Sequence, residues 1–357
     1  MPAATEPTAA PPVPHSLWAA VQAAAGERSW PPASDASADR LVAQAAREGL
    51  LPLLFESPDL PGVLTAALDR HRGWQRLAEA RAQILARALG VVAGLLDGEP
   101  FAVLKGADYM WRLYGRPVLR PMQDIDLLVP AARLDAVCER LRAGGLRYRP
   151  PARAARAASS YYERAFLLGD VVVEVHQSFL QRSRHPVDYG ALWERRRPVP
   201  ALGPGAARLD DVDAVAYHAL SMAKDEFTVP LVRYFDLRLM LLAAPGVLRP
   251  AAARAREWKA SRALFAALHE LRRLFPDLDT TEMDAVAGEL SGPLARRFLA
   301  RFVLPPARER GRAGAVTRRL QLWRKFWLLD GSRRRLAFVF EHAAATAEGW
   351  WRRGTPA

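Results

Sequence analysis

Apolar positions in the first quarter of the chain recur every three or four residues. The pattern runs through DRLVAQAAREGLLPLLF and through GWQRLAEARAQILARALGVVAGLL, with prolines 58 and 61 between the two stretches. This spacing is that of one face of an α-helix, and proline interrupts a helix. We therefore predict an N-terminal helical region over residues 15–95. Residues 1–14 carry no signal-peptide pattern and are predicted to be a disordered leader.

The periodicity changes between residues 96 and 200. Runs with strand character lie at 101–104, 124–129, 161–168 and 171–175. The last two are joined by Gly169-Asp170, a strong signal for a two-residue hairpin turn. An amphipathic helix, ARLDAVCERLRAGG, follows the second run and is stopped by paired glycines. These alternations predict a small α/β core over residues 96–200.

Helical spacing returns after the loop ALGPGAAR and continues to the last residue. The segments LDDVDAVAYHALSMAKDEF and LVRYFDLRLMLL come first, and arginine-rich amphipathic helices follow. We predict a C-terminal helical region over residues 201–357. The predicted fold class is therefore α+β, with a small mixed sheet flanked in sequence by two helical regions.

Charge is concentrated at the C-terminal end. The formal net charge is +13, and the part from Arg301 onward holds thirteen Lys and Arg against four Asp and Glu. This tail is a candidate for contact with a polyanion. Its segment QLWRKFWLLDGSRRRLAFVF and the later Trp350-Trp351 set aromatic residues beside cations. Such residues stack on bases or grip a membrane surface, or they form the buried stripe of a helix whose arginines face water.

Cysteine use and hydropathy bear on the compartment. The single cysteine, Cys138, permits no disulfide within the chain and no cysteine zinc cluster, and its apolar neighbourhood predicts a buried thiol. No stretch approaches the roughly 18 to 20 apolar residues that a membrane-spanning helix needs. We expect a cytoplasmic protein in a reducing compartment.

Two aspartates lie two positions apart in the apolar run MQDIDLLV. On a strand, Asp124 and Asp126 project from one face, and Ile125 and Leu127 project from the other. Paired carboxylates on a rigid strand suit Mg²⁺, which prefers oxygen ligands and completes its shell with water and substrate phosphate. Alone, the pattern is equally typical of the acidic end of a surface strand.

A third carboxylate occurs in the run VVVEVHQSF. Glu174 is the acid of this run, and burial without a partner would be unfavourable. If its strand lies beside that of Asp124, three carboxylates converge and can hold metal ions for phosphoryl transfer. The alternative is an outward-facing glutamate. His176 shares the face of Glu174 and is expected either to orient a ligand or touch the nucleotide, or to be a semi-buried structural histidine.

The segment LKGAD predicts a turn from a strand into a helix. Gly106 allows close backbone approach, the helix N-terminus offers N–H groups to phosphate, and Lys105 adds a positive charge. The plain alternative is an ordinary turn with a surface lysine, and the spacing is not that of a P-loop. Arg116 and Arg120, in YGRPVLRPMQ, precede the aspartate strand and are candidates for phosphate contact.

The string LKGADYMWRLYGRPVLRPMQDIDLLV resembles the core of an uncharacterised bacterial nucleotidyltransferase family, NTP transferase 5, a branch of the DNA polymerase beta superfamily. The likeness extends from the AAREGLLPLLF segment through VEVHQSF to the helices that carry His218, Lys224 and Asp236. It implies a polymerase-beta-like nucleotidyltransferase core. It also implies that the catalytic metal ligands are Asp124, Asp126 and Glu174.

The same resemblance suggests further binding roles. The LKG turn corresponds to the family's phosphate-binding turn, and Lys224 is placed near the triphosphate. The chain departs from the pattern at Ala107, where the superfamily usually has serine, and at Gln177, where an aromatic residue is common. Asp236 is expected to form a structural pair with Arg233 or with one of the motif lysines.

These residues together predict a nucleotidyltransferase that depends on Mg²⁺ or Mn²⁺. It would move a nucleoside monophosphate from a nucleoside triphosphate to an acceptor hydroxyl and release pyrophosphate. The sequence leaves open whether the acceptor is a small molecule, a peptide or protein, or RNA. Two alternatives remain: a non-catalytic scaffold of the same fold that binds a nucleotide or a partner, and a toxin-like tRNA nucleotidyltransferase.

Overall fold

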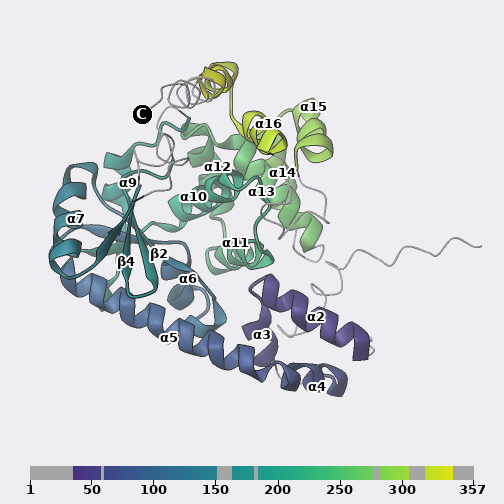
Figure 1. Ribbon diagram of the computed structural model, residues 1–357. Coiled ribbons are helices and arrows are strands. Elements are labelled where there is room, and N and C mark those ends of the chain that lie inside the picture. The colour runs from purple at the N-terminus through teal and green to yellow at the C-terminus, as the bar shows by residue number, and fades with distance from the viewer. Residues whose placement is uncertain are drawn as a thin grey trace, which may run out of the picture.

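The computed structural model describes residues 35–57, 60–150, 163–180, 184–275, 278, 281–304 and 318–340. A seven-stranded sheet lies between helices on both of its faces, so the protein belongs to the α+β class (Figure 1). The predicted leader, the helical start at residues 15–34 and Trp350-Trp351 lie outside the described residues. The predicted α+β class is confirmed, and the polymerase-beta-like core stays a prediction.

Four helices precede the sheet in the described chain: α2 (Asp35–Arg47), α3 (Leu51–Phe55), α4 (Gly62–Arg70) and α5 (Arg72–Leu95). The turn between α2 and α3 contains Gly49, whose φ is +71°. A side chain there would also approach Val232 to 2.9 Å, so both the backbone conformation and the contact with a later helix favour glycine.

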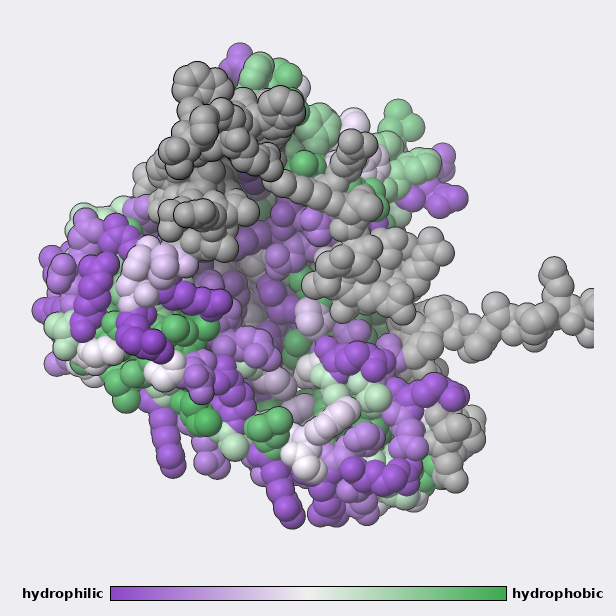
Figure 2. Space-filling view, viewed as in Figure 1, coloured by the Kyte–Doolittle hydropathy of each residue, from purple (hydrophilic) through white to green (hydrophobic). Residues whose placement is uncertain are grey.

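The longest of these helices, α5, runs along one side of the sheet (Figure 1). Its buried face packs Leu85, Leu89 and Val92 against the strands. Its outer face exposes Leu77, Ile84 and Val91, and Figure 2 shows apolar patches along this helix among hydrophilic side chains.

The sheet has the strand order β3-β4-β5-β2-β1-β7-β6. β2 pairs parallel with β5 and β1 pairs parallel with β7, while the other pairs are antiparallel. The strands are β1 (Phe101–Leu104), β2 (Asp124–Leu128), β3 (Arg147–Arg149), β4 (Glu163–Leu168), β5 (Val171–His176), β6 (Arg197–Pro198) and β7 (Ala206–Arg208).

The strands β1, β2, β4 and β5 lie where the alternation of the sequence predicts them, and the β4–β5 hairpin turns at Gly169-Asp170 as predicted. Three short strands were not predicted. The segment ALGPGAAR, read as a loop, contains β7, and β6 lies just before residue 200. A strand of two or three residues is too short to show a period, so only its pairing with a neighbour defines it.

Each face of the sheet packs on its own apolar cluster. One cluster holds Ile125, Leu127, Val173 and Val175 together with side chains of α5 and α7. The other lies toward the C-terminal helices and includes Leu128. The helices between strands are α6 (Gly106–Arg112), η1 (Pro117–Leu119), η2 (Ala131–Arg133), α7 (Leu134–Ala143), α9 (Tyr189–Arg195) and η3 (Pro200–Leu202). Cys138, on α7, is buried as predicted.

The helices after the sheet cover its second face. They are α10 (Asp211–Lys224), α11 (Leu231–Ala243), α12 (Leu248–Glu257), α13 (Ser261–Leu274), α14 (Thr281–Leu290), α15 (Pro293–Phe298), the π-helical η4 (Leu299–Val303) and α16 (Arg318–Leu328). Trp327 of α16 packs edge-on against Phe298, which matches the alternative of a packed aromatic stripe for this residue. Within the described residues, no helix combines the length and apolar character needed to cross a bilayer.

Candidate functional site

The register of the neighbouring parallel strands β2 and β5 brings the predicted carboxylates together. Asp126 of β2 lies directly opposite Glu174 of β5. Asp124 is two residues earlier on β2 and therefore projects from the same face. Ile125 and Leu127 project from the other face and are fully buried, as their alternation predicts. The sheet thus directs all three carboxylates toward the C-terminal helices.

His176 joins this cluster from the end of β5. Its Nε2 lies 3.0 Å from Oδ1 of Asp126 and 3.6 Å from Oε2 of Glu174. One ligand atom from each of these three residues falls within 4.8 Å of the others. Two carboxylates and one imidazole at this spacing are a donor set that fits a divalent cation, and His176 is 3% exposed.

Lys105 supplies the positive charge beside the carboxylates. Its Nζ lies 2.7 Å from Oδ1 of Asp126. The backbone of Lys105 has φ of +49°, an uncommon conformation for a residue with a side chain. The next residue, Gly106, begins α6, and a Cβ at that position would lie 2.9 Å from Cβ of Met122. The turn therefore favours glycine because Met122, in the loop before β2, packs closely against it.

The charges of the cluster shift one another's pKa values. Burial and the neighbouring charge of Asp126 raise the pKa of Asp124 to about 6. Burial opposes ionisation of Asp126, but the ammonium of Lys105 and the hydrogen bond from His176 outweigh it and hold its pKa below the usual range. The hydrogen bond from His176 lowers the pKa of Glu174. Asp126 and Glu174 are therefore anionic at neutral pH, as metal ligands must be.

Burial also acts on the pKa values of Lys105 and His176. It disfavours the charged forms of Lys105 and His176, but their carboxylate partners outweigh it and raise the pKa of each. Lys105 thus supplies a positive charge beside the carboxylates of this face of the sheet. A divalent metal ion would bind the same carboxylate oxygens that Lys105 and His176 contact.

A cleft of about 750 Å³ opens beside the carboxylates. Lys105, Gly106, Asp124 and Asp126 form one end of it, and a mixture of apolar and charged side chains, many of them from α3, α5 and η1, lines the rest. Clefts of roughly 300–1,000 Å³ are typical of small-molecule sites. The carboxylates therefore face a space large enough for a nucleotide or for an acceptor.

Arg120, predicted to contact phosphate, is engaged elsewhere. It is 5% exposed, and its Nε and Nη2 each donate to a carboxylate oxygen of Asp236 at 2.6 Å. Tyr114 also donates to Asp236, at 2.8 Å. The expected partner of Asp236 was Arg233 or a motif lysine, and that expectation was wrong. The pair with Arg120 ties the loop before β2 to α11.

The other candidate residues lie around the cluster's rim. Arg116 pairs with Glu56 on the N-terminal side of the cleft. Nζ of Lys224, at the end of α10, lies 3.8 Å from Oε2 of Glu163. The same oxygen lies 3.6 Å from Nδ1 of His176. The nucleotide-binding roles of Lys105, Gly106, Arg120, Lys224 and His176 remain predictions.

Sequence reasoning missed Glu163. It lies directly opposite His176 in the antiparallel β4–β5 pair. The sequence carried the signal, because a two-residue turn at Gly169-Asp170 fixes which residues of the two strands face each other. Counting outward from that turn places Glu163 beside the metal-binding candidates.

A known family model covers most of the elements described above. The sequence model of a family described as uncharacterised nucleotidyltransferases matches residues 34–276. The chain belongs to this family. The matched range begins at α2 and ends just after α13, so it includes the sheet, the carboxylate cluster and the helices that face it. Neither a curated protein nor a solved structure matches the chain.

Family membership indicates nucleotidyl transfer as the activity class, with a nucleotide as substrate. Asp126, Glu174 and His176 form a cluster that could hold a divalent cation. The two observations are independent, since one comes from the sequence profile and the other from side-chain geometry.

Proposed function

We propose that the chain is a metal-dependent nucleotidyltransferase with a core of the DNA polymerase beta type, in which Asp124, Asp126 and Glu174 hold Mg²⁺ or Mn²⁺. The observation that carries this proposal is the register of two strands, which sets Asp126 opposite Glu174 and Asp124 on the same face. His176 adds a donor that the sequence-based triad did not include. The family match supports the reaction class.

Asp124 and Lys105 have distinct tasks in this proposed reaction. The acceptor oxygen forms a bond to the α-phosphorus, the bond from that phosphorus to the bridging oxygen breaks, and its electron pair leaves with pyrophosphate. Asp124, which lines the cleft, takes the proton of the acceptor hydroxyl. Lys105 offers its ammonium to a phosphate oxygen from its place beside Asp126. The bound metal supplies electrostatic stabilisation of the phosphate oxygens.

The direct test incubates the chain with each nucleoside triphosphate, labelled at the α-phosphate, and with Mg²⁺ or Mn²⁺. Pyrophosphate release and label transfer are measured with the chain itself, tRNA and a set of hydroxylated small molecules as acceptors. Asp124→Asn is the matched inactive control, because an amide is a poor substitute for a carboxylate at a metal. Asp124 is preferable to Asp126 for this purpose, since the latter forms a buried ion pair.

Binding is tested separately by thermal unfolding with metal and each triphosphate. A ligand a hundredfold above its dissociation constant stabilises the native state by about 2.7 kcal/mol. We expect one or more triphosphates to raise the midpoint in wild type and not in Asp124→Asn. If no triphosphate shifts the wild-type midpoint in the presence of metal, the enzyme assignment is wrong and the chain is a scaffold.

A further inference from the structure

A second, small cavity lies behind the carboxylate cluster, between the sheet and helices α10 and α11. Its volume is about 40 Å³. Its charged lining residues are three cations, Lys105, Lys224 and Arg233, and one acid, Asp225. Lys105, Asp225 and Arg233 also line the large cleft, so the cavity is a side pocket of it. Lys105 and Lys224 each face a carboxylate outside this lining, Asp126 and Glu163, which leaves Arg233 as the cation to explain in a pocket that adjoins the metal-binding candidates.

Arg233 is the cation of this pocket with no acidic partner. Its Nη2 donates to the hydroxyl of Ser221, and its Nε is buried without a hydrogen-bond partner. Among the described residues, no carboxylate lies within ion-pair distance of Arg233. The contrast is Arg120, which has a bidentate pair with Asp236, three residues after Arg233 on α11. Arg233 is half-buried, and a guanidinium that is partly withdrawn from water without a counter-ion is unfavourable unless an anion joins it.

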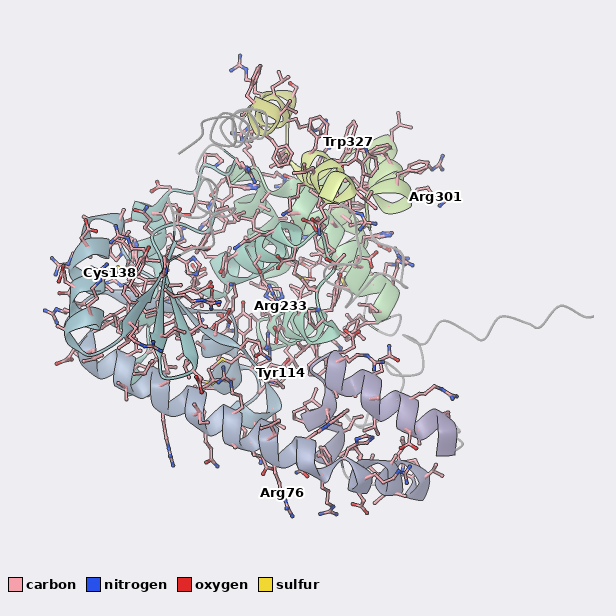
Figure 3. The ribbon with its side chains drawn as sticks, in the orientation of Figure 1. Arg76, Tyr114, Cys138, Arg233, Arg301 and Trp327 are labelled. Carbon is pink, nitrogen blue, oxygen red and sulfur yellow. The ribbon has the colours of Figure 1, made fainter. Side chains whose placement is uncertain are left out.

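Helix α11 fixes the position of Arg233. The backbone N–H of Leu231 donates to Oε2 of Glu48 at 2.8 Å, and that of Val232 donates to the carbonyl of Glu48 at 3.1 Å. Nε2 of His218 donates to the carbonyl of Arg233 at 2.7 Å. Figure 3 shows Arg233 on α11 at the centre of the molecule, toward the sheet. These hydrogen bonds fix the backbone that carries the guanidinium, and the hydroxyl of Ser221 holds its Nη2.

We propose that Arg233, together with Lys224, binds the terminal phosphates of the triphosphate and the pyrophosphate that leaves. The pocket itself holds little more than one water, which occupies roughly 30 Å³ in the liquid, but Arg233 also lines the large cleft, where a phosphate group can reach its guanidinium. A planar guanidinium suits phosphate because it donates two parallel hydrogen bonds. The inference rests on the proposed function and adds a phosphate-binding residue on a helix far from the LKG turn.

The placement gives the two cavities different tasks. Lys105 lies where they meet, beside Asp126. The α-phosphorus would lie at this junction, with the pyrophosphate at the mouth of the side pocket beside Arg233 and the acceptor hydroxyl farther along the large cleft. Negative charge that develops on the leaving oxygen then faces the cations of the pocket.

The experiment measures binding of inorganic pyrophosphate, in the presence of Mg²⁺, to the full chain by calorimetry. We compare wild type with Arg233→Gln and Arg233→Lys. Arg238→Lys is the matched control, because Arg238 is on the same helix but lies over the ring of Phe275 and lines neither cavity. We expect Arg233→Gln to weaken pyrophosphate affinity at least tenfold, Arg233→Lys to weaken it less, and Arg238→Lys to leave it unchanged.

Stability without ligand separates a phosphate-binding role from a structural one. Removing an unpaired buried charge should leave the unfolding midpoint of Arg233→Gln unchanged or raise it, whereas a structural residue would lower it. Equal pyrophosphate affinity in Arg233→Gln and wild type, or no binding by wild type, would overturn the inference. If Arg233→Gln does not fold, Arg233→Lys carries the same comparison.

The outcomes also distinguish this inference from the proposed function. Nucleotidyl transfer by wild type combined with normal pyrophosphate binding by the Arg233 variants would leave the function standing and remove the role of Arg233. Pyrophosphate binding that depends on Arg233, without nucleotidyl transfer to any acceptor, would support the pocket and contradict the enzyme assignment.

Discussion

Nζ of Lys105 lies 2.7 Å from Oδ1 of Asp126, and the Asp126 side chain is 3% exposed. The two residues are 21 positions apart and come from the turn after β1 and from the middle of β2. Without a metal ion, this ammonium is the nearest cation that the structure gives to Asp126. The pair therefore links the stability of the fold to the charge balance of the proposed active site.

Replacing Lys105 by methionine should strongly destabilise the metal-free protein. The change leaves Asp126 buried beside other carboxylates, and breaking a buried ion pair in this way typically lowers stability by about 3–5 kcal/mol. Added Mg²⁺ should recover part of the loss by supplying a new cation. Urea unfolding with and without Mg²⁺ measures both effects.

The control for this variant is Arg249→Met, which removes an exposed ion pair with Glu289. Exposed pairs contribute about 0–1 kcal/mol, so this variant should unfold almost as wild type does. Equal stability of Lys105→Met and Arg249→Met would show that the buried pair does not hold the cluster together.

Replacing Asp124 by asparagine should have the opposite effect on stability. The pKa of Asp124 in the fold is about 6, above its ordinary value, so the folded state binds its proton more tightly than the unfolded state does. That contribution to stability is present at low pH and is lost as the pH rises through 6. At pH 8 the uncharged asparagine should therefore raise the free energy of unfolding by about 1–3 kcal/mol.

The pH dependence provides the check on this prediction. The advantage of Asp124→Asn should shrink between pH 8 and pH 5, and the variant should lose the stabilisation that wild type gains from Mg²⁺. If Asp124→Asn is less stable than wild type at pH 8 without metal, the surroundings of Asp124 stabilise its ionised carboxylate. That result would contradict the prediction.

The pair between Arg120 and Asp236 should behave as a structural ion pair. Asp236→Asn leaves the buried guanidinium of Arg120 without its counter-ion, so we expect a loss of about 3–5 kcal/mol in denaturant unfolding. The double variant Arg120→Met/Asp236→Leu should lose less, because both charges are removed together. Triphosphate binding by the double variant tests the predicted phosphate contact of Arg120. A normal affinity of this variant for triphosphate would exclude that contact.

His185 should make the protein sensitive to acid. Burial lowers its pKa to about 4, and its Nδ1 donates to the carbonyl of Trp258. The unfolded state binds this proton at a higher pH than the folded state does, so the contribution of His185 is present above pH 6.5 and is lost as the pH falls toward 4. Between pH 7 and pH 5 the loss amounts to about 2 kcal/mol.

The variant His185→Gln keeps a side-chain N–H donor but does not titrate. Unfolding by urea at pH 7 and at pH 5 should show a smaller loss of stability for this variant than for wild type, by about the 2 kcal/mol expected for one buried histidine. An identical loss in the two proteins would mean that His185 keeps its ordinary pKa in the fold.

The sequence by itself determined the elements that have a clear period and the chemistry of their faces. Alternation in MQDIDLLV and VVVEVHQSF placed Asp124, Asp126 and Glu174 on polar faces, and the buried Ile125 and Val173 confirm it. A strand alternates every second residue whatever it pairs with, so this information is local. The family likeness rested on the same segments.

Only the tertiary structure decided which elements lie next to one another. It paired β7 with β1, Lys105 with Asp126 and Arg120 with Asp236, and it left Arg233 facing the side pocket without an acid. Local periodicity shows which side of a helix or strand is buried, but not which distant side chain meets it there. Ion-pair partners depend on how packed helices close over the sheet, and that is set by the whole core together.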